Sequence, residues 1–186
     1  MDSQKVMDRA KEKMAKAINV VSDELKGVRT GRASAGLLDR INVDYYGTPT
    51  PIKQLASINV PEAQLITIQP WDKSTIAAVE RAILSSDIGI TPSNDGNIIR
   101  LSMPPLTEER RRDLSKVVHH MGEEAKIALR NVRREAIEEL KHLQKDSKIS
   151  EDDYYREHDH TQKITDEHAH KVDELVKAKE SELMTV

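Results

Sequence analysis

Six arginines lie in one stretch of this chain, Thr107 to Lys145, in two groups: Arg110–Arg112, then Arg130, Arg133 and Arg134. A guanidinium group makes two parallel hydrogen bonds to a phosphate and stacks on flat rings, which an ammonium group does less well. The formal net charge of the chain is −3, so any affinity for nucleic acid must come from a local patch. The arginine groups are therefore the first candidates for a binding surface.

The same stretch has the pattern of one long helix. Pro104 and Pro105 end the secondary structure element that precedes them, and Thr107 is a suitable N-cap. Between Thr107 and Lys145 the only residue that weakens a helix is Gly122. Spacings of three and four predict an inward seam of Leu114, Val118, Met121, Ala125, Ala128, Val132, Ala136 and Leu143. A helical wheel of this stretch places an exposed basic stripe opposite that seam, with Arg111 and Arg133 on its flanks. The stripe consists of Arg112, Lys116, His119, Lys126, Arg130 and Arg134.

Three interpretations of the basic stripe remain open on residues alone. It binds structured RNA or another phosphate ligand, it binds a protein partner, or it is a solvated helix face whose charges pair with neighbours. The concentration of arginine favours the first. No recognition motif for DNA or for single-stranded RNA is present, so sequence-specific reading is not indicated.

Enzymatic chemistry is not indicated. The chain has no GxxxxGK[ST] loop, no GxGxxG, no GxSxG and no cysteine. Acidic pairs such as Glu138-Glu139 and Asp152-Asp153 are typical of exposed helix faces and helix starts. We therefore expect neither a catalytic centre nor a bound cofactor.

The histidines do not predict a metal site. His158 and His160, like His168 and His170, are two residues apart on one expected helix, so they point to different faces. We expect surface histidines, with His168 at the edge of the inward seam.

The elements around the arginine stretch predict two domains. Residues 2–29 repeat apolar side chains at helical spacing until Thr30-Gly31, and a third helix opens at Ser150 and runs to about Met184. Between the first two helices, residues 31–104 hold six Lys or Arg and seven Asp or Glu, less than half the charge density of the rest, and six of the seven prolines. Short β-like runs and one helix near Ser74–Ser86 predict a mixed sheet there.

The predicted fold class is α+β: an elongated three-helix bundle with an inserted small β/α domain. The bundle comprises residues 1–30 and 105–186, and the β/α domain comprises 31–104. The chain crosses between them twice, which predicts a two-strand hinge at Thr30, Gly31, Pro104 and Pro105. The charged N-terminus is not a secretory signal, and no apolar run reaches membrane-spanning length. With no cysteine, these features favour the cytoplasm.

Several motifs resemble one family. The segments Val28–Ser34, Asp44–Pro51, Gln54–Ser57, Pro104–Arg111 and Arg130–Arg134 are similar to the bacterial ribosome recycling factor family. The resemblance implies a translation factor, not an enzyme, which acts with elongation factor G to split the post-termination ribosome. It implies no cofactor, because the partner uses the GTP. It implies the large ribosomal subunit and its rRNA as further partners, no DNA, no membrane and a monomeric state.

The resemblance also ranks the arginines. It implies RNA contacts from Arg29, Arg32, Arg111, Arg130 and above all Arg133, whereas the helical wheel favours the stripe that includes Arg134. The predicted RNA-binding or ribosome-binding set therefore combines both: Arg29, Arg32, Arg111, Arg130, Arg133 and Arg134. A protein that binds another structured RNA and a helical scaffold for a protein partner remain the alternatives.

Overall fold

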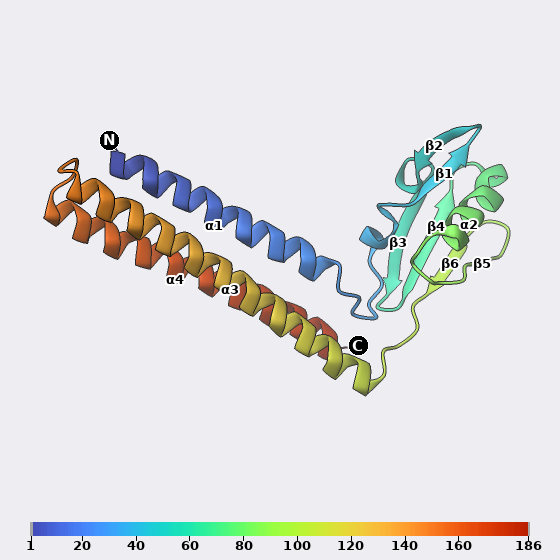
Figure 1. Cartoon of the computed structure of the whole chain (residues 1–186). Coiled ribbons are helices and arrows are strands. Elements are labelled where there is room, and N and C mark those ends of the chain that lie inside the picture. Colours follow the sequence, from blue (N-terminus) through green and yellow to red (C-terminus); the bar gives the residue numbers. More distant parts are fainter. Residues whose placement is uncertain (1, 186) are drawn as a thin grey trace. The chain divides into compact units, whose positions relative to one another are not determined.

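The computed structural model describes residues 2–185, and the chain forms two compact units (Figure 1). A helical unit comprises residues 2–29 together with Glu108–Thr185, and a β/α unit comprises Thr30–Thr107. The β/α unit is thus inserted in the chain between two helices of the helical unit. This arrangement confirms the predicted α+β fold, a helical bundle interrupted by a small sheet-containing segment. None of the described helices is long and apolar enough to cross a membrane.

Three long helices form the helical unit: α1 (Asp2–Lys26), α3 (Glu108–Lys145) and α4 (Glu151–Met184). The Ser150 side chain caps α4 by accepting a 3.0 Å hydrogen bond from the Asp153 amide, as the sequence predicts. At the end of α3, Ser147 has φ 56°, and the Lys148 amide donates to the Leu143 carbonyl at 2.9 Å. That Schellman-type ending reverses the chain within a few residues, so α3 and α4 run antiparallel side by side (Figure 1).

The bundle core is aliphatic and lies where all three helices meet. Its fully buried side chains are Met7, Met14, Val21, Val118, Leu129, Leu140, Val172 and Leu183. The predicted seam of α3 is partly wrong, because Ala128 is exposed while Leu129 and Leu140 are buried. The alanines of α3 are spaced so that either of two neighbouring stripes of side chains could face the core, and the larger leucines determine which one does.

Gly122 brings α3 and α4 unusually close. A Cβ at this position would lie 2.6 Å from Cγ2 of Val176 on α4, far inside van der Waals contact. Glycine weakens a helix interior, so its place in the middle of α3 reflects this close packing. The two helices therefore share a tight seam from which their neighbouring side chains project.

The β/α unit contains two sheets. Strands β1 (Asn42–Tyr45) and β2 (Thr48–Pro51) form a hairpin, and β3 (Ala56–Glu62), β4 (Leu65–Pro70), β6 (Ile99–Ser102) and β5 (Ser93–Asn94) form a four-stranded sheet in the order β3-β4-β6-β5. All pairings are antiparallel, so the expectation of a mixed sheet is wrong. Strand propensity carries no information about strand direction, and β2 and β5 consist of Thr, Pro, Ser and Asn, of which Pro, Ser and Asn favour turns.

The β/α unit has its own core. Helix α2 (Ile76–Ser85) buries Val79 and Ile83 in a cluster that also contains Ile66, Ile68, Ile99 and Leu101 of the sheet. Asp72 holds the short 3₁₀ turn (Lys73–Thr75) that leads into α2, accepting from the Ser74 amide at 2.9 Å. The Ser74 hydroxyl also donates to Asp72, at 2.7 Å, and this bond together with that of the amide lowers the pKa of the Asp72 carboxyl.

Candidate nucleic-acid interface

Helix α3 has two charged edges that differ in their partners. Along the side that meets α1, Glu139 accepts from Arg9 at 3.2 Å and Glu135 accepts from Lys13 at 2.6 Å. We call this pair of glutamates the α1 edge. Along the side that meets α4 lie Arg130, Arg133, Arg134 and Lys141, which we call the α4 edge. The α1 edge is thus acidic, whereas the α4 edge is mainly basic and has Glu138 beside it.

Most cations of the α4 edge face solvent. Arg130, Arg134 and Lys141 are exposed, and among residues 2–185 none of the three has an ion-pair or hydrogen-bond partner. Arg130 and Arg134 are four residues apart, so their side chains lie one above the other along α3. Two unneutralised guanidinium groups at that spacing suit successive phosphates of a nucleic-acid backbone.

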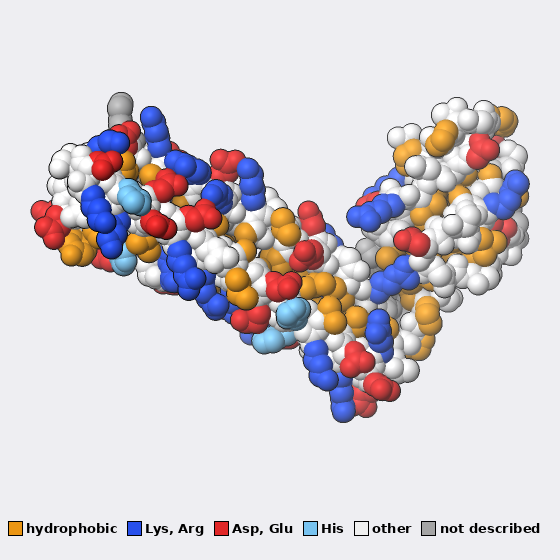
Figure 2. All heavy atoms as spheres, in the orientation of Figure 1, with side chains coloured by type: hydrophobic (Ala, Val, Ile, Leu, Met, Phe, Trp, Pro, Cys, Tyr) orange, Lys and Arg blue, Asp and Glu red, His pale blue; other side chains and the backbone are white. Residues whose placement is uncertain are grey.

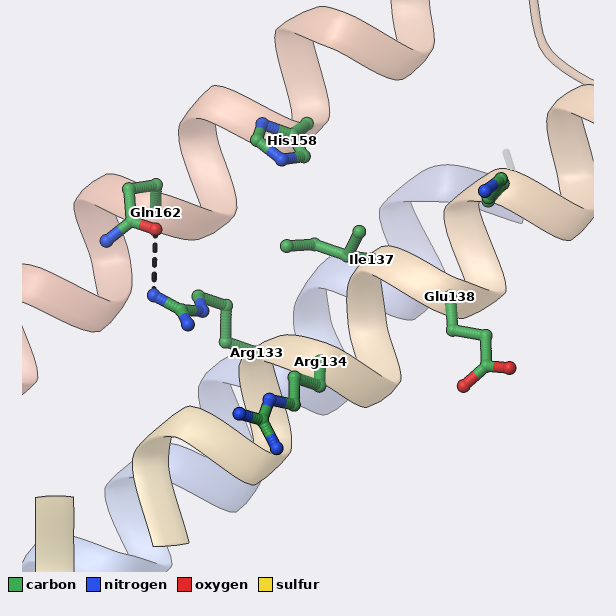
Figure 3. Close-up of a pocket in the computed structure, with 7 residues that line it drawn as sticks. Arg133, Arg134, Ile137, Glu138, His158 and Gln162 are labelled. Atoms are coloured by element: carbon green, nitrogen blue, oxygen red, sulfur yellow. Dashed lines mark hydrogen bonds between the residues drawn. The ribbon is translucent and has the colours of Figure 1, made fainter. Parts of the chain in front are cut away.

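Arg133 is held in place by α4. Its Nη1 donates to Oε1 of Gln162 at 3.0 Å (Figure 3). Nε2 of Gln162 in turn donates to Oδ1 of Asp166 at 2.8 Å. The side chain is half-buried, and most of its N–H donors remain for a ligand. Fixing the guanidinium before a ligand arrives lowers the entropic cost of binding. The family resemblance ranked Arg133 first, whereas nothing in the sequence pointed to Gln162, whose contact crosses between helices.

A shallow depression of about 510 Å³ lies between α3 and α4 beside these cations. It is lined from α3 by Arg133, Arg134, Ile137, Glu138 and Lys141, and from α4 by His158 and Gln162. Arg133 and Ile137 point toward α4, whereas Glu138 points away from His158 and Gln162 (Figure 3). Arg133 thus faces the hollow more directly than Glu138 does (Figure 3).

Lys126 does not belong to the exposed stripe predicted for α3. Its Nζ forms an ion pair with Asp173 of α4 at 2.5 Å and a weaker one with Glu123 at 3.5 Å. The hydrogen bond that Lys126 donates to Asp173 raises the pKa of the Lys126 ammonium. The helical wheel placed this side chain outward because it was centred on the wrong seam, and the partner on α4 is invisible to a local pattern. Lys126 links the two helices.

The remaining predicted arginines are distributed differently. Arg111 is half-buried near the start of α3, and Arg29 is exposed just after α1. Arg32 is also exposed but belongs to the β/α unit. The structure therefore groups Arg130, Arg133 and Arg134 on one short part of α3. The visible face of the helical unit as a whole carries Lys and Arg interspersed with Asp and Glu (Figure 2).

The predicted hinge residues lie in the two segments that connect the units. Thr30 is buried, Pro104 and Pro105 are exposed, and Gly31 has φ +75°. A Cβ on Gly31 would lie 3.1 Å from Cγ of Leu106, so the two segments touch inside the β/α unit. The Ala33 and Met103 amides donate to the carbonyls of Ala63 and Gln64, each at 2.7 Å. Both segments are thereby anchored to the same β-turn.

The histidines form no metal site in the described part of the chain, where no three His, Asp or Glu side chains converge. His168, the one expected at the seam, is half-buried, and its Nδ1 lies 2.7 Å from the Ile164 carbonyl. His158 is half-buried at the depression described above.

Comparison with known proteins places this chain in a family. The family model described as "Ribosome recycling factor" matches residues 21–184. The ribosome-recycling factor of Geobacillus kaustophilus is 56% identical over 99% of this chain and 100% of its own length. That of Nitratidesulfovibrio vulgaris is 53% identical over the full length of both.

Two solved structures are also similar over nearly their whole length. One is a solution structure of a ribosome recycling factor, with a TM-score of 0.80 and 42% identity, covering 100% of this chain and 99% of the other. The other is the model of a T. thermophilus ribosome recycling factor bound, with E. coli elongation factor G, to the E. coli post-termination complex. It has a TM-score of 0.67 and 41% identity, covering 99% of this chain and 100% of the other. The chain belongs to the ribosome recycling factor family.

Proposed function

We propose that this protein splits the post-termination ribosome together with elongation factor G, which hydrolyses the GTP. The observation that carries the proposal is the full-length similarity to a recycling factor that sits on the post-termination complex beside elongation factor G. Family membership makes the chain a translation factor with neither enzymatic activity nor a cofactor of its own. The protein acts as a monomer in the cytoplasm.

The helical unit supplies the RNA contact. Arg130 and Arg134 have no intramolecular partner among residues 2–185, and Arg133 is pre-positioned by Gln162. Their ligand is rRNA of the large subunit, with further contacts from Arg29, Arg32 and Arg111. Binding through phosphates releases counterions, so the affinity falls steeply with salt.

The two connecting segments act as the hinge between the domains. Thr30–Gly31 and Pro104–Pro105 lie between the helical unit and the points at which Ala33 and Met103 are hydrogen-bonded to the β-turn. Each connecting segment is only a few residues long, so motion is confined to these short stretches. Elongation factor G pushes the β/α unit, and the bundle transmits the force to a subunit bridge.

The test is a splitting assay on post-termination complexes, followed by light scattering. Splitting that requires this protein, elongation factor G and GTP together supports the proposal, and no splitting with all three present contradicts it.

Two variants separate binding from force transmission. Arg133→Ala reduces the fraction of the protein that co-sediments with large ribosomal subunits, while its helix content stays unchanged. Pro104→Gly with Pro105→Gly loosens the hinge, so it spares binding and slows splitting. Equal loss of both activities in the hinge variant would contradict the lever mechanism.

A further inference from the structure

The depression between α3 and α4 has the chemistry of a site for a flat ring attached to an anion. Ile137 supplies an apolar surface, and the His158 ring stands beside it on α4 (Figure 3). Among the lining residues, Arg133, Arg134 and Lys141 are positively charged and Glu138 is negatively charged. The hollow is shallow and open to solvent, and at about 510 Å³ it has room for a ring as well as a phosphate.

Arg133, one of the two groups that would face a ring, is already held in place, and His158, the other, has two neighbours on α4. Gln162 holds the Arg133 guanidinium from one side, and Asp166 holds Gln162 in turn. The His158 ring lies 6.1 Å from the Tyr154 ring, centroid to centroid, and its Nδ1 is 3.4 Å from the Asp159 carboxylate. Guanidinium and imidazole planes are both stacking partners for nucleobases, and a held plane loses less entropy on stacking.

We propose that this depression binds one unstacked nucleobase of an RNA strand, with the adjoining phosphates on Arg134 and Lys141. The inference rests on the proposed RNA-binding function and deepens it, because it adds a base contact to the phosphate contacts of the α4 edge. The base lies on Ile137 between the planes of Arg133 and His158. Stacking strengthens with ring size, so purines bind better than pyrimidines.

The probes are two hexamers labelled with 5′-fluorescein, hexaadenylate and a hexamer with the same ribose-phosphate backbone but no bases. Anisotropy titrations at low salt use the full-length protein. The expected result is at least about fivefold tighter binding of hexaadenylate, which is the lower end of what one stacked base contributes. Equal affinity for the two hexamers, or binding of neither, would overturn the inference.

Variants locate the effect. His158→Ala and Ile137→Ala lower the affinity for hexaadenylate to that for the abasic hexamer, and leave the abasic affinity unchanged. The matched control is His170→Ala, an exposed α4 histidine paired with Glu174 at 3.4 Å, which changes neither affinity. His158 is 40% exposed, so its replacement leaves the thermal midpoint within a few degrees. A hexaadenylate preference that survives both His158→Ala and Ile137→Ala contradicts the site.

Failure of this inference differs from failure of the proposed function. Arg134→Ala weakens binding of both hexamers equally, because it removes a phosphate contact that the bases do not share. If Arg134→Ala weakens binding but the native protein binds hexaadenylate and the abasic hexamer equally well, the RNA-binding role of the α4 edge is supported and the base site is contradicted. Adenosine monophosphate serves as the last probe: affinity equal to that of hexaadenylate would assign the hollow to a free nucleotide and overturn its assignment to RNA.

Discussion

The two charged edges of α3 show how one helix divides its charges between stability and binding. On the α1 edge, Glu135 and Glu139 are neutralised by Lys13 and Arg9 of the neighbouring helix. On the α4 edge, Arg130, Arg134 and Lys141 have no partner within residues 2–185. Like charges gathered without compensation cost stability, so they persist where an external ligand supplies the opposite charge.

Neighbouring side chains sharpen this contrast. Lys126, also on the α4 side, is paired with Asp173 and therefore resembles the α1 edge. Arg133 is intermediate, since it is bound to a neutral amide that orients it without neutralising it. Position on the helix alone thus does not identify a binding cation, whereas position together with the absence of a countercharge does.

The largest effect is expected from reversing charge on the α4 edge. Arg133→Glu with Arg134→Glu replaces two attractions by two repulsions, and we expect binding to large ribosomal subunits to weaken by about 100-fold or more. Sedimentation or filter binding measures it. Lys5→Glu with Lys11→Glu makes the same change in net charge on exposed positions of α1 and should cost only a few-fold. Comparable losses in the two variants would mean that net charge, not the α4 edge, governs binding.

Breaking the close approach of α3 and α4 should destabilise the bundle. Gly122→Ala forces a methyl group against Val176. We therefore expect the free energy of unfolding, measured in urea, to fall by about 1–3 kcal/mol. Ala128→Leu, which enlarges an exposed residue of α3, should change it by less than about 0.5 kcal/mol. Adding Val176→Ala to Gly122→Ala relieves the contact, and failure of that second change to recover any stability would count against the packing.

Releasing Arg133 should weaken binding moderately. Gln162→Ala removes the bond that orients the guanidinium, so we expect about 3–10-fold weaker binding to large subunits with little change in stability. Gln4→Ala is the matched control, because Gln4 donates to Asp8 at 2.8 Å on α1 as Gln162 does to Asp166 on α4. Identical binding by the Gln162 variant and the native protein would show that Arg133 needs no positioning.

The smallest effect is expected on the α1 edge. Arg9→Ala with Lys13→Ala removes both ion pairs, but these side chains are about half exposed. We therefore expect a stability loss of about 0.5 kcal/mol or less per pair, and unchanged binding to large subunits. Thermal unfolding and the same binding assay check both statements; weaker binding here would remove the distinction between the edges.

The sequence predicted the elements better than their contacts. Pro104-Pro105 and the Ser150 cap are local signals, and they locate the starts of α3 and α4 closely. Ala128 was assigned inward because alanine fits either side of a seam, although Val118, Leu129 and Leu140, spaced three turns apart, carry the correct signal.

The site depends on pairs that sequence spacing does not reveal. Lys126 was assigned to the exposed stripe, and Gln162 was overlooked, because their partners Asp173 and Arg133 lie on another helix. The emphasis on Arg133 came from the family resemblance, not from periodicity. Its neighbours Arg130 and Arg134 were predicted exposed and are exposed, since that follows from their own helix.

The salt dependence of binding tests the central claim most directly. The affinity for large subunits is measured across a range of KCl for the native protein, for Arg130→Ala with Arg134→Ala, and for Arg9→Ala with Lys13→Ala. Each phosphate contact removed should lower the slope of log affinity against log salt by about one, so the first variant loses about two and the second loses nothing. An unchanged slope in the Arg130 and Arg134 variant would contradict an RNA-binding role for the α4 edge.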